Sequence, residues 1–398
     1  MNRDIAYREY NKRNDIHGTV LYPAVMVAPV QKSILLDIID NDKYTKIIDP
    51  FHGSGTSLYE AMEVSENIFL VGCDINPLAN LITRVKLQGV SNNIESNINK
   101  LALLLKQPFN NYKHSFPNIE KWFYDNIICS LSHIRNCIKE IENDKDRLFF
   151  WCMFINIIRK YSNTRSSTYK LHVKELEKLG KTEDNTIKDF IKAIKDNYNK
   201  YLKSFNRFVL HKGDIQKVSQ DFPNDEFDIC ITSPPYGDNK TTVPYGQFSS
   251  LALYWIDNSD IELEGWELTN YSIIDTMSLG GRIIKNQRSI FVEENYSDVS
   301  DSKKKKLVSY FNDYFKILDE MTRITKNYII MTLGNRTVDG INIDLTNITI
   351  RYLKSKGFKN QEILERDLIS KRIPSKVSRV NNKAVSSMNK EYVIVMKK

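Results

Sequence analysis

The chain has 398 residues, of which 57 are Lys or Arg and 49 are Asp or Glu, so its formal net charge is +8. This length suits one large domain with insertions or two domains, and the positive charge favours a polyanionic partner. The cysteines are scattered, with no Cys-x-x-Cys pair, which argues against a zinc site or a disulfide framework and favours a reduced compartment. No apolar run approaches the ~20 residues of a membrane-spanning helix. We therefore expect a soluble, cytoplasmic protein with no membrane partner and no metal.

The first recognisable unit is a strand, a tight turn and a helix. The apolar segment 46–49 runs into Gly53 and Gly55, and apolar residues from Leu58 onward recur at helical spacing. Glycines at such a turn let a ligand approach the backbone, and the start of the helix offers free N–H groups. The turn lacks the Gly-Lys-Ser/Thr ending of a P-loop and the spacing of a dinucleotide site. It predicts a small-ligand site of another kind.

The next strand, predicted over 68–73, ends at Asp74. An acidic residue at the tip of the second strand is where such folds bind the hydroxyls of an adenosine ribose. A carboxylate on a surface turn is the alternative interpretation of Asp74.

The rest of the chain alternates helical and strand patterns. Helical spacing prevails from about residue 92 to 205, strands return at 208–210 and 227–232, an irregular interval covers 257–302, and one long amphipathic helix follows. We predict five segments: a cofactor-binding half of the catalytic domain (1–90), a helical insertion that could recognise the target (91–206), a catalytic-loop half (207–256), an irregular insertion that could contact DNA (257–302) and the remainder of the catalytic domain (303–398).

The tetrapeptide Ser233–Tyr236, Ser-Pro-Pro-Tyr, follows the strand 227–232. Two prolines cannot continue a hydrogen-bond ladder, so the carbonyl groups there stay unpaired and the following aromatic ring is held at the strand tip. Acceptors beside a flat ring suit a planar amine, such as the exocyclic amine of cytosine or adenine. The Ser233 hydroxyl and the Pro234 carbonyl would accept the two amine hydrogens while Tyr236 stacks on the base. The alternative is a proline-terminated strand that enters an ordinary loop.

Together these segments resemble the DNA amino-methyltransferases, which methylate N4 of cytosine or N6 of adenine with S-adenosyl-L-methionine. The resemblance rests on segments along most of the chain: Leu21–Ala24, Asp49–Thr56, Gly72–Pro77, Gly213–Asp214, Thr232–Gly237, Arg323–Asn335 and Glu391–Met396. It implies a Rossmann-like α/β fold with a mostly parallel seven-stranded sheet and a helical insertion. The glycine loop precedes the catalytic loop, which excludes the circularly permuted order that the family also shows.

The resemblance also implies roles for individual residues. Catalysis falls to Ser233, Pro234, Pro235 and Tyr236, and S-adenosyl-L-methionine binding to Tyr22, Pro23, Asp49, Pro50, Phe51, Gly53, Gly55, Thr56, Asp74, Ile75 and Asp214. Because Ser stands first in the catalytic motif, cytosine N4 is the implied target, flipped out of double-stranded DNA. The resemblance implies a restriction–modification methyltransferase and leaves open whether a cognate restriction endonuclease accompanies it.

Candidate DNA contacts come from three places. Tyr245 and Phe248 follow the catalytic loop closely enough to flank a flipped base, with core packing as the alternative. Arg165 belongs to a loop that interleaves aromatic, hydroxyl and basic side chains, and Lys371 and Arg372 begin a basic segment without acids. Three other functions stay open: an N6-adenine DNA methyltransferase, an RNA amino-methyltransferase, and a DNA-binding module that keeps the cofactor fold without turnover.

Overall fold

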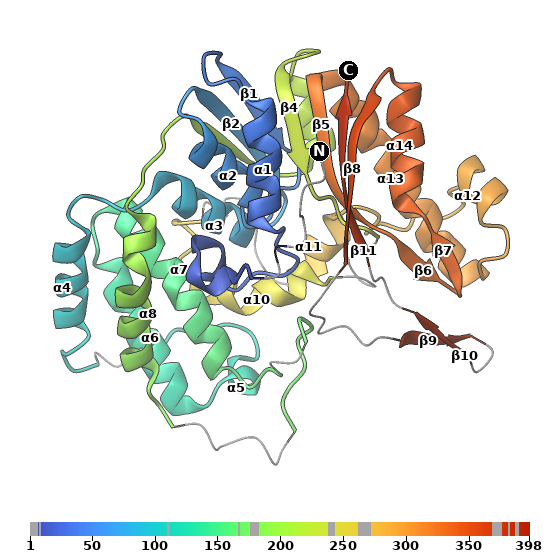
Figure 1. Ribbon diagram of the computed structural model, residues 1–398. Coiled ribbons are helices and arrows are strands. Elements are labelled where there is room, and N and C mark those ends of the chain that lie inside the picture. Colours follow the sequence, from blue (N-terminus) through green and yellow to red (C-terminus); the bar gives the residue numbers. More distant parts are fainter. Residues whose placement is uncertain are drawn as a thin grey trace.

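The computed structural model describes residues 7, 9–109, 112–165, 168–175, 183–237, 243–261, 272–367, 376–380, 383–386 and 390–398. A seven-stranded sheet forms its centre, in the order β3-β2-β1-β4-β5-β11-β8 (Figure 1). Its strands are β1 (Thr45–Asp49), β2 (Ile68–Asp74), β3 (Phe208–Lys212), β4 (Phe227–Thr232), β5 (Thr325–Gly334), β8 (Lys359–Asp367) and β11 (Lys390–Lys397). Strands β1 to β5 pair in parallel, and β11 runs antiparallel to both neighbours. This confirms the predicted α/β class.

Helices cover both faces of this sheet, which explains why its inner strands are apolar on both sides. In β1, Ile47 packs toward α1 (Ala28–Ile38) and α2 (Thr56–Val64), while Ile48 packs on the opposite face toward α13 (Asp301–Ile324) and α14 (Leu345–Ser355). The helices α3 (Pro77–Gln88) and α9 (Ile215–Val218) follow β2 and β3 directly. The parallel strands therefore all present their carboxyl ends at one edge, where the connecting loops meet.

The helical region between α3 and β3 shares its hydrophobic core with the catalytic half of the chain. Its helices are α4 (Ile94–Leu104), α5 (Ile119–Trp122), α6 (Asp125–Lys139), α7 (Asp144–Tyr161) and α8 (Thr186–Asn197). Their buried side chains share one hydrophobic cluster with α3 and with α10 (Tyr245–Trp255), the helix after the catalytic loop. The predicted division at residues 91 and 206 stays a prediction, and packing joins this helical region to the catalytic half.

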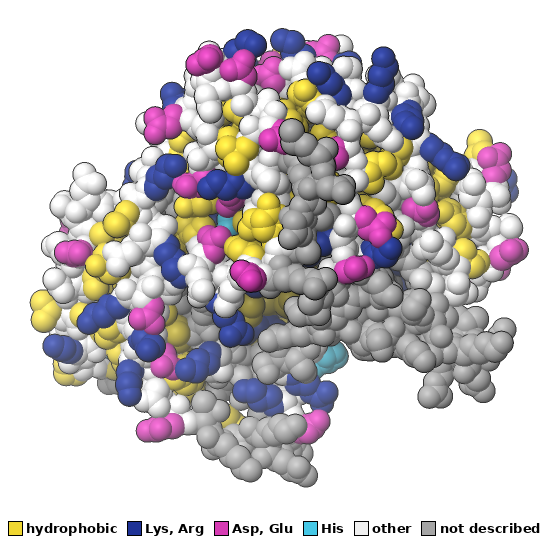
Figure 2. Space-filling view, viewed as in Figure 1, with side chains coloured by type: hydrophobic (Ala, Val, Ile, Leu, Met, Phe, Trp, Pro, Cys, Tyr) yellow, Lys and Arg dark blue, Asp and Glu magenta, His cyan; other side chains and the backbone are white. Residues whose placement is uncertain are grey.

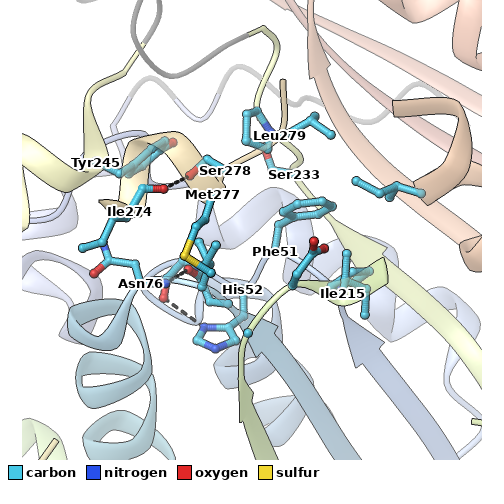
Figure 3. Close-up of a pocket in the computed structure, with 18 of the residues that line it drawn as sticks. Phe51, His52, Asn76, Ile215, Ser233, Tyr245, Ile274, Met277, Ser278 and Leu279 are labelled. Atoms are coloured by element: carbon cyan, nitrogen blue, oxygen red, sulfur yellow. Dashed lines mark hydrogen bonds between the residues drawn. The ribbon is translucent and has the colours of Figure 1, made fainter. Parts of the chain in front are cut away.

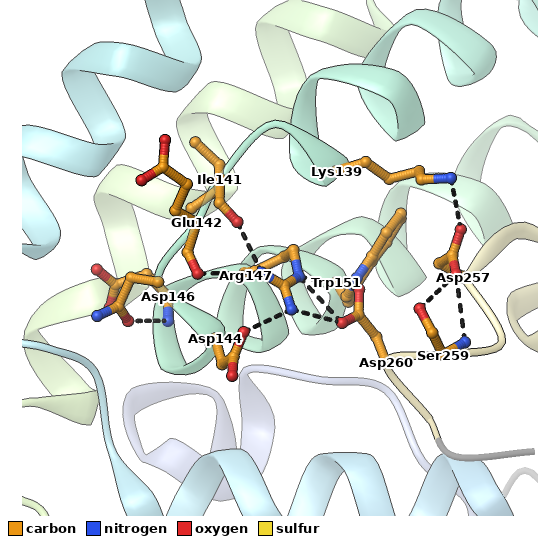
Figure 4. A network of polar contacts seen from close by, with 11 residues as sticks. Lys139, Ile141, Glu142, Asp144, Asp146, Arg147, Trp151, Asp257, Ser259 and Asp260 are labelled. Atoms are coloured by element: carbon orange, nitrogen blue, oxygen red, sulfur yellow. Dashed lines mark hydrogen bonds and ion pairs between the residues drawn. The ribbon is translucent and has the colours of Figure 1, made fainter.

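A polar network fixes the segment after α10 to this helical region (Figure 4). The Asp260 carboxylate accepts hydrogen bonds from Arg147 Nε at 3.0 Å and from the indole N–H of Trp151 at 2.7 Å. Lys139 Nζ lies 2.8 Å from Asp257 Oδ2. Because Trp151 is fully buried and the Asp260 side chain is only 9% exposed, these contacts hold α7 against the loop that leads away from the catalytic half.

The remaining elements are short. They are β6 (Arg336–Val338) with β7 (Ile341–Ile343), β9 (Lys376–Val380) with β10 (Lys383–Ser386), the helices α11 (Ser272–Met277) and α12 (Ile290–Asn295), and the 3-10 turns η1 (Lys12–Asn14), η2 (Ile16–Gly18), η4 (Tyr198–Tyr201) and η5 (Ser219–Asp221). The interval predicted as irregular thus contains two short helices. On the face in Figure 2, positive and negative side chains are interspersed over the described surface. Within the described ranges, no helix combines the length and apolar character that crossing a membrane requires.

Candidate functional site

A cavity of about 350 Å³ opens at the carboxyl ends of the parallel strands (Figure 3). Crevices at this edge are the usual ligand sites of open α/β sheets. Most of the residues that the sequence assigns to the cofactor line it: Tyr22, Pro23, Pro50, Phe51, Gly53, Thr56, Asp74, Ile75 and Asp214. Ser233, Pro235 and Tyr245 line the same cavity. Segments separated by more than two hundred positions in the chain therefore meet in one site.

The glycine turn between β1 and α2 adopts the conformation that its sequence predicts. Gly53 and Gly55 have φ angles of +50° and +74°, a region that other residues adopt with strain. A Cβ atom on Gly55 would also lie 2.6 Å from the Thr83 side chain. Gly55 precedes α2 without a side-chain cap, so the first N–H groups of the helix stay free of side-chain acceptors at the turn. Thr56 lines the cavity, and its buried hydroxyl has no hydrogen-bond partner among the described residues.

Asp74, at the end of β2, is oriented by two backbone donors. Its carboxylate accepts hydrogen bonds from Gly53 N at 2.9 Å and from Asn76 N at 2.8 Å. Each oxygen keeps a further lone pair, and the side chain lies in the cavity wall. Asp214, which caps α9 by accepting from Gln216 N at 3.0 Å, contributes a second carboxylate to the wall. The site thus offers two acidic acceptors beside apolar surface.

Asp49 lies below the cavity and not in its wall. The side chain is fully buried, and its carboxylate accepts hydrogen bonds from the Ser57 hydroxyl, from Thr232 Oγ1 at 2.6 Å and from Phe51 N at 3.0 Å. Burial raises the pKa of Asp49, and the bonds from Ser57 and Thr232 oppose this rise. Three donors from the glycine turn, α2 and the tip of β4 therefore converge on one buried acceptor, which joins the two halves of the predicted site.

A second buried group supports the glycine turn from beneath. Lys86 Nζ donates to the Ser54 carbonyl at 2.7 Å and lies 3.2 Å from His17 Nδ1, while His17 Nε2 lies 2.8 Å from Glu60 Oε1. These contacts fit a neutral His17 that accepts from Lys86 and donates to Glu60. Burial lowers the pKa of Lys86 to about 7 and raises that of Glu60 to about 7. The Lys86 ammonium thus holds the Ser54 carbonyl of the turn, and His17 and Glu60 hold Lys86 in place.

The catalytic motif follows β4 as the sequence predicts, but its side chains point in different directions. Ser233 lines the cavity, and its hydroxyl lies 3.2 Å from the hydroxyl of Tyr236. Tyr236 does not line the cavity in this structure; its ring packs against the core between the sheet and α13, and its hydroxyl donates to Glu391 Oε1 at 3.4 Å. The Pro235 carbonyl accepts from Tyr310 at 2.9 Å, and Pro234 is buried. Stacking of Tyr236 on a base therefore requires its ring to turn.

The two aromatic residues of α10 differ in position. Tyr245 lines the cavity and stacks on Tyr22, with ring centroids 5.9 Å apart. Phe248 lies behind that wall, 5% exposed, with the Arg159 guanidinium 4.7 Å from its ring centroid and the Tyr169 ring 5.7 Å away. Core packing, the alternative interpretation from the sequence, therefore describes Phe248, because Arg159, Tyr169 and Tyr22 surround its ring.

Of the basic residues assigned to DNA, Arg165 is described by the structure and does not line the cavity. Arg165 is exposed beside the bridge between Thr164 and Val173, where its Nε donates to the Val173 carbonyl at 3.3 Å. Lys371 and Arg372 lie outside the described residues. Their role in binding phosphates stays a prediction.

Sequence reasoning missed one wall of the cavity. It consists of α11 and the residues after it, from which Ile274, Met277, Ser278 and Leu279 line the site (Figure 3). Arg282 lines the same cavity. The only signal in the sequence was the pair Gly280-Gly281, whose tight approach to α11 and α13 depends on the absence of side chains. In the described part of the chain, no three His, Cys, Asp or Glu side chains are placed to hold a metal ion.

The donors of this cavity fit an adenosine-containing sulfonium cofactor. Ile75 and Ile215 supply apolar surface for a flat base, and Asp74 and Asp214 supply acceptors for hydroxyl and amine groups. The unpartnered Thr56 hydroxyl and the uncapped start of α2 offer donors to a carboxylate. The residues present therefore suit the hydroxyl, amine and carboxylate groups of S-adenosyl-L-methionine.

Comparison with solved structures gives weak matches. A DNA modification methylase from Thermus thermophilus in complex with S-adenosyl-L-methionine is 14% identical, with 47% of this chain and 53% of that chain covered and a TM-score of 0.24. An arsenic(III) S-adenosylmethionine methyltransferase from Chlamydomonas reinhardtii is 9% identical, with 92% and 72% covered and a TM-score of 0.29. Scores this low carry no argument about this chain. No protein-family model matches it.

Comparison with characterised sequences is decisive. The type II methyltransferase M.MvaI of Kocuria varians is 30% identical over 438 aligned positions, which cover all of this chain and 94% of that protein. The alignment spans both the strand tips that form the cavity and the helical region between them. The chain therefore belongs to the type II methyltransferases.

Proposed function

We propose that this protein is a site-specific DNA methyltransferase of a restriction–modification system that methylates the exocyclic N4 of a cytosine flipped out of the duplex. Its methyl donor is S-adenosyl-L-methionine, which supplies an electrophilic methyl group on a sulfonium sulfur. One observation carries the proposal: Ser233, at the tip of β4, opens onto the same cavity as Asp74 and the glycine turn.

The cofactor end of the cavity is assigned from the direction of its polar groups. Asp74, held by two backbone N–H groups, would accept from the ribose hydroxyls with its remaining lone pairs. Asp214 would accept from the adenine amine, and Tyr22 and Pro23 would close over the methionine end. Asp49 would act from below by holding the glycine turn against β4.

The catalytic end is assigned to Ser233 and its neighbours. A cytosine amine is a weak nucleophile because its lone pair is delocalised into the ring. The Ser233 hydroxyl and the Pro234 carbonyl would each accept one amine hydrogen, which turns the nitrogen toward tetrahedral geometry and frees the lone pair. With Tyr245 as a wall, catalysis would then be mainly the alignment of the nitrogen with the methyl group: the N–C bond would form as the S–C bond breaks, and the amine would afterwards release a proton to solvent.

The preference for cytosine rests on Ser233, since a neutral hydroxyl accepts less strongly than a carboxylate at the same position. Adenine N6 in DNA and a base in RNA are the alternatives. Incubation of the purified protein with labelled S-adenosyl-L-methionine and duplex DNA, followed by mass spectrometry of the nucleosides, tests all three. We expect N4-methylcytosine. N6-methyladenine as the only product would refute the cytosine assignment, and transfer to RNA but to no duplex would refute the DNA substrate.

Sequencing of modified bases in the DNA of a host that expresses the chain would then give the recognition sequence. A methylated base at one fixed sequence is expected of a restriction–modification enzyme. Methylation without a fixed sequence would contradict site specificity while leaving the chemistry in place.

A further inference from the structure

The segment 282–288, Arg-Ile-Ile-Lys-Asn-Gln-Arg, presents an unusual surface beside the cavity. Ile283 and Ile284 are adjacent apolar residues, 52% and 60% exposed. The flanking Arg282, Lys285 and Arg288 are also exposed, and within the described ranges none of these three basic side chains forms an ion pair. Apolar side chains bordered by positive charges on a monomer surface commonly mark a binding site.

The segment is fixed at both ends while its middle stays exposed. At its start, Gly280 N donates to Asp313 Oδ2 at 3.0 Å, and a Cβ atom on Gly280 would lie 2.9 Å from Tyr310 Cα. At its end, Asn312 Nδ2 donates to the Arg288 carbonyl at 3.0 Å. Both anchors are on α13, so this helix holds the segment in place without covering the side chains between the two ends.

The segment 282–288 lies at the cavity that contains Ser233. Arg282, Ile284 and Gln287 line the cavity that also contains Ser233, so Ile284 stands at the rim of the space that would receive a target base, with the exposed Ile283 next to it in the chain. A base that leaves the duplex exposes the stacked faces of its neighbours, and proteins that deform DNA frequently insert apolar side chains at such steps. Positive side chains on either side would lie against the phosphates, where they fix the register of the protein on the duplex.

We propose that the segment 282–288 binds the DNA duplex beside the flipped base: Ile283 and Ile284 occupy the stack that the base has left, and Arg282, Lys285 and Arg288 contact the flanking phosphates. The inference rests on the proposed DNA substrate and assigns part of its recognition surface. It requires no contact between these residues and the cofactor.

Two variants test the two parts of the surface. In Ile283→Ala/Ile284→Ala, kcat/KM on a duplex with a paired target should fall by about tenfold or more, since unstacking costs a few kcal/mol. The loss should be much smaller on a duplex with an abasic site opposite the target, because the base there is already weakly held. In Arg282→Ala/Lys285→Ala/Arg288→Ala, the slope of log affinity against log salt should become shallower by about 0.9 for each phosphate that is no longer neutralised.

Matched controls come from the edge strand β8 and from the amino end of β5, away from the carboxyl ends of the strands where the cavity opens. Ile363→Ala removes an isoleucine that is 46% exposed on β8, and Lys326→Ala removes an exposed lysine at the start of β5. Neither should change kcat/KM or the salt slope. S-adenosyl-L-methionine affinity, measured by calorimetry, should be unchanged in all variants.

The results separate this inference from the proposed function. The insertion is refuted if the wild-type protein methylates duplex DNA and the isoleucine variant loses kcat/KM equally on the duplex with a paired target and on the duplex with an abasic site. It is also refuted if the variant loses kcat/KM on neither duplex. An unchanged salt slope in the triple variant refutes the phosphate contacts. Loss of cofactor affinity in either variant assigns the segment to the cofactor and also overturns the inference. A wild-type protein that methylates no duplex refutes the proposed function itself.

Discussion

Asp49 offers the sharpest test of how the site is built, because the sequence assigns it to the cofactor and the structure places it beneath the cavity. Asp49→Ala would leave three buried donors, on Phe51, Ser57 and Thr232, without their acceptor. Each buried donor without a partner costs about 1–3 kcal/mol. The two hydroxyls can rotate toward other acceptors, but the Phe51 N–H cannot, so we expect a loss of about 3–5 kcal/mol in the free energy of unfolding.

Asp49→Asn separates this structural role from direct binding. The amide keeps the shape and one acceptor oxygen, and a hydroxyl that faced the second oxygen can reverse and accept from the amide nitrogen. We expect a loss of only about 1 kcal/mol in the free energy of unfolding. Affinity for S-adenosyl-L-methionine should fall by less than about tenfold, which corresponds to about 1.4 kcal/mol.

Urea unfolding followed by circular dichroism gives the free energy, and calorimetry at a temperature where both proteins are folded gives the affinity. Asp74→Asn serves as the matched variant, because that carboxylate faces the cavity. If Asp49→Asn keeps its urea midpoint but loses as much affinity for S-adenosyl-L-methionine as Asp74→Asn, Asp49 contacts the cofactor, and its position beneath the cavity is refuted.

The remaining predictions concern four other residues. Asp74→Ala should weaken S-adenosyl-L-methionine binding by roughly ten- to a hundredfold, the ~1.5–3 kcal/mol of a charge-assisted contact, and unchanged calorimetry in a folded variant would remove the ribose assignment. Ser233→Ala should abolish most turnover while affinity for S-adenosyl-L-methionine stays nearly intact. Equal losses in turnover and in cofactor affinity would show that Ser233 does not act mainly in the transition state. Lys86, whose pKa burial lowers from 10.5 to about 7, binds its proton more weakly in the folded chain than in the unfolded one, so it contributes a stability that rises with pH between those two values. The free energy of unfolding of the wild type should therefore increase relative to that of Lys86→Met between pH 7 and pH 10. A difference that does not depend on pH would contradict the lowered pKa of Lys86. Asp260→Ala should lower the free energy of unfolding by about 3 kcal/mol, because it deprives the Arg147 guanidinium and the Trp151 indole N–H of this acceptor, and a loss well under 1 kcal/mol would show that water replaces the carboxylate.

The strands that carry the motifs could be predicted from short stretches of sequence. The segment 227–232 coincides with β4, and the predicted strand before Asp74 ends within one residue of β2. These strands are apolar on both faces and end at proline, glycine or a charged residue, so local composition is enough to define them. By contrast, β8 escaped prediction because it is an edge strand with charged residues along most of its length and a single buried side chain, Leu364.

The order of the motifs and the backbone of the two loops follow from the amino-acid sequence alone, because proline fixes φ wherever it occurs and glycine permits the positive φ angles that a tight turn needs. The same sequence could not tell which side chains face the cavity. That Tyr236 turns toward Glu391, that Phe248 lies behind Tyr245, and that α11 forms a wall are results of packing between segments far apart in the chain. A side chain's direction follows from the neighbours that fill the space around it, and those neighbours are set only when the sheet brings its strand tips together.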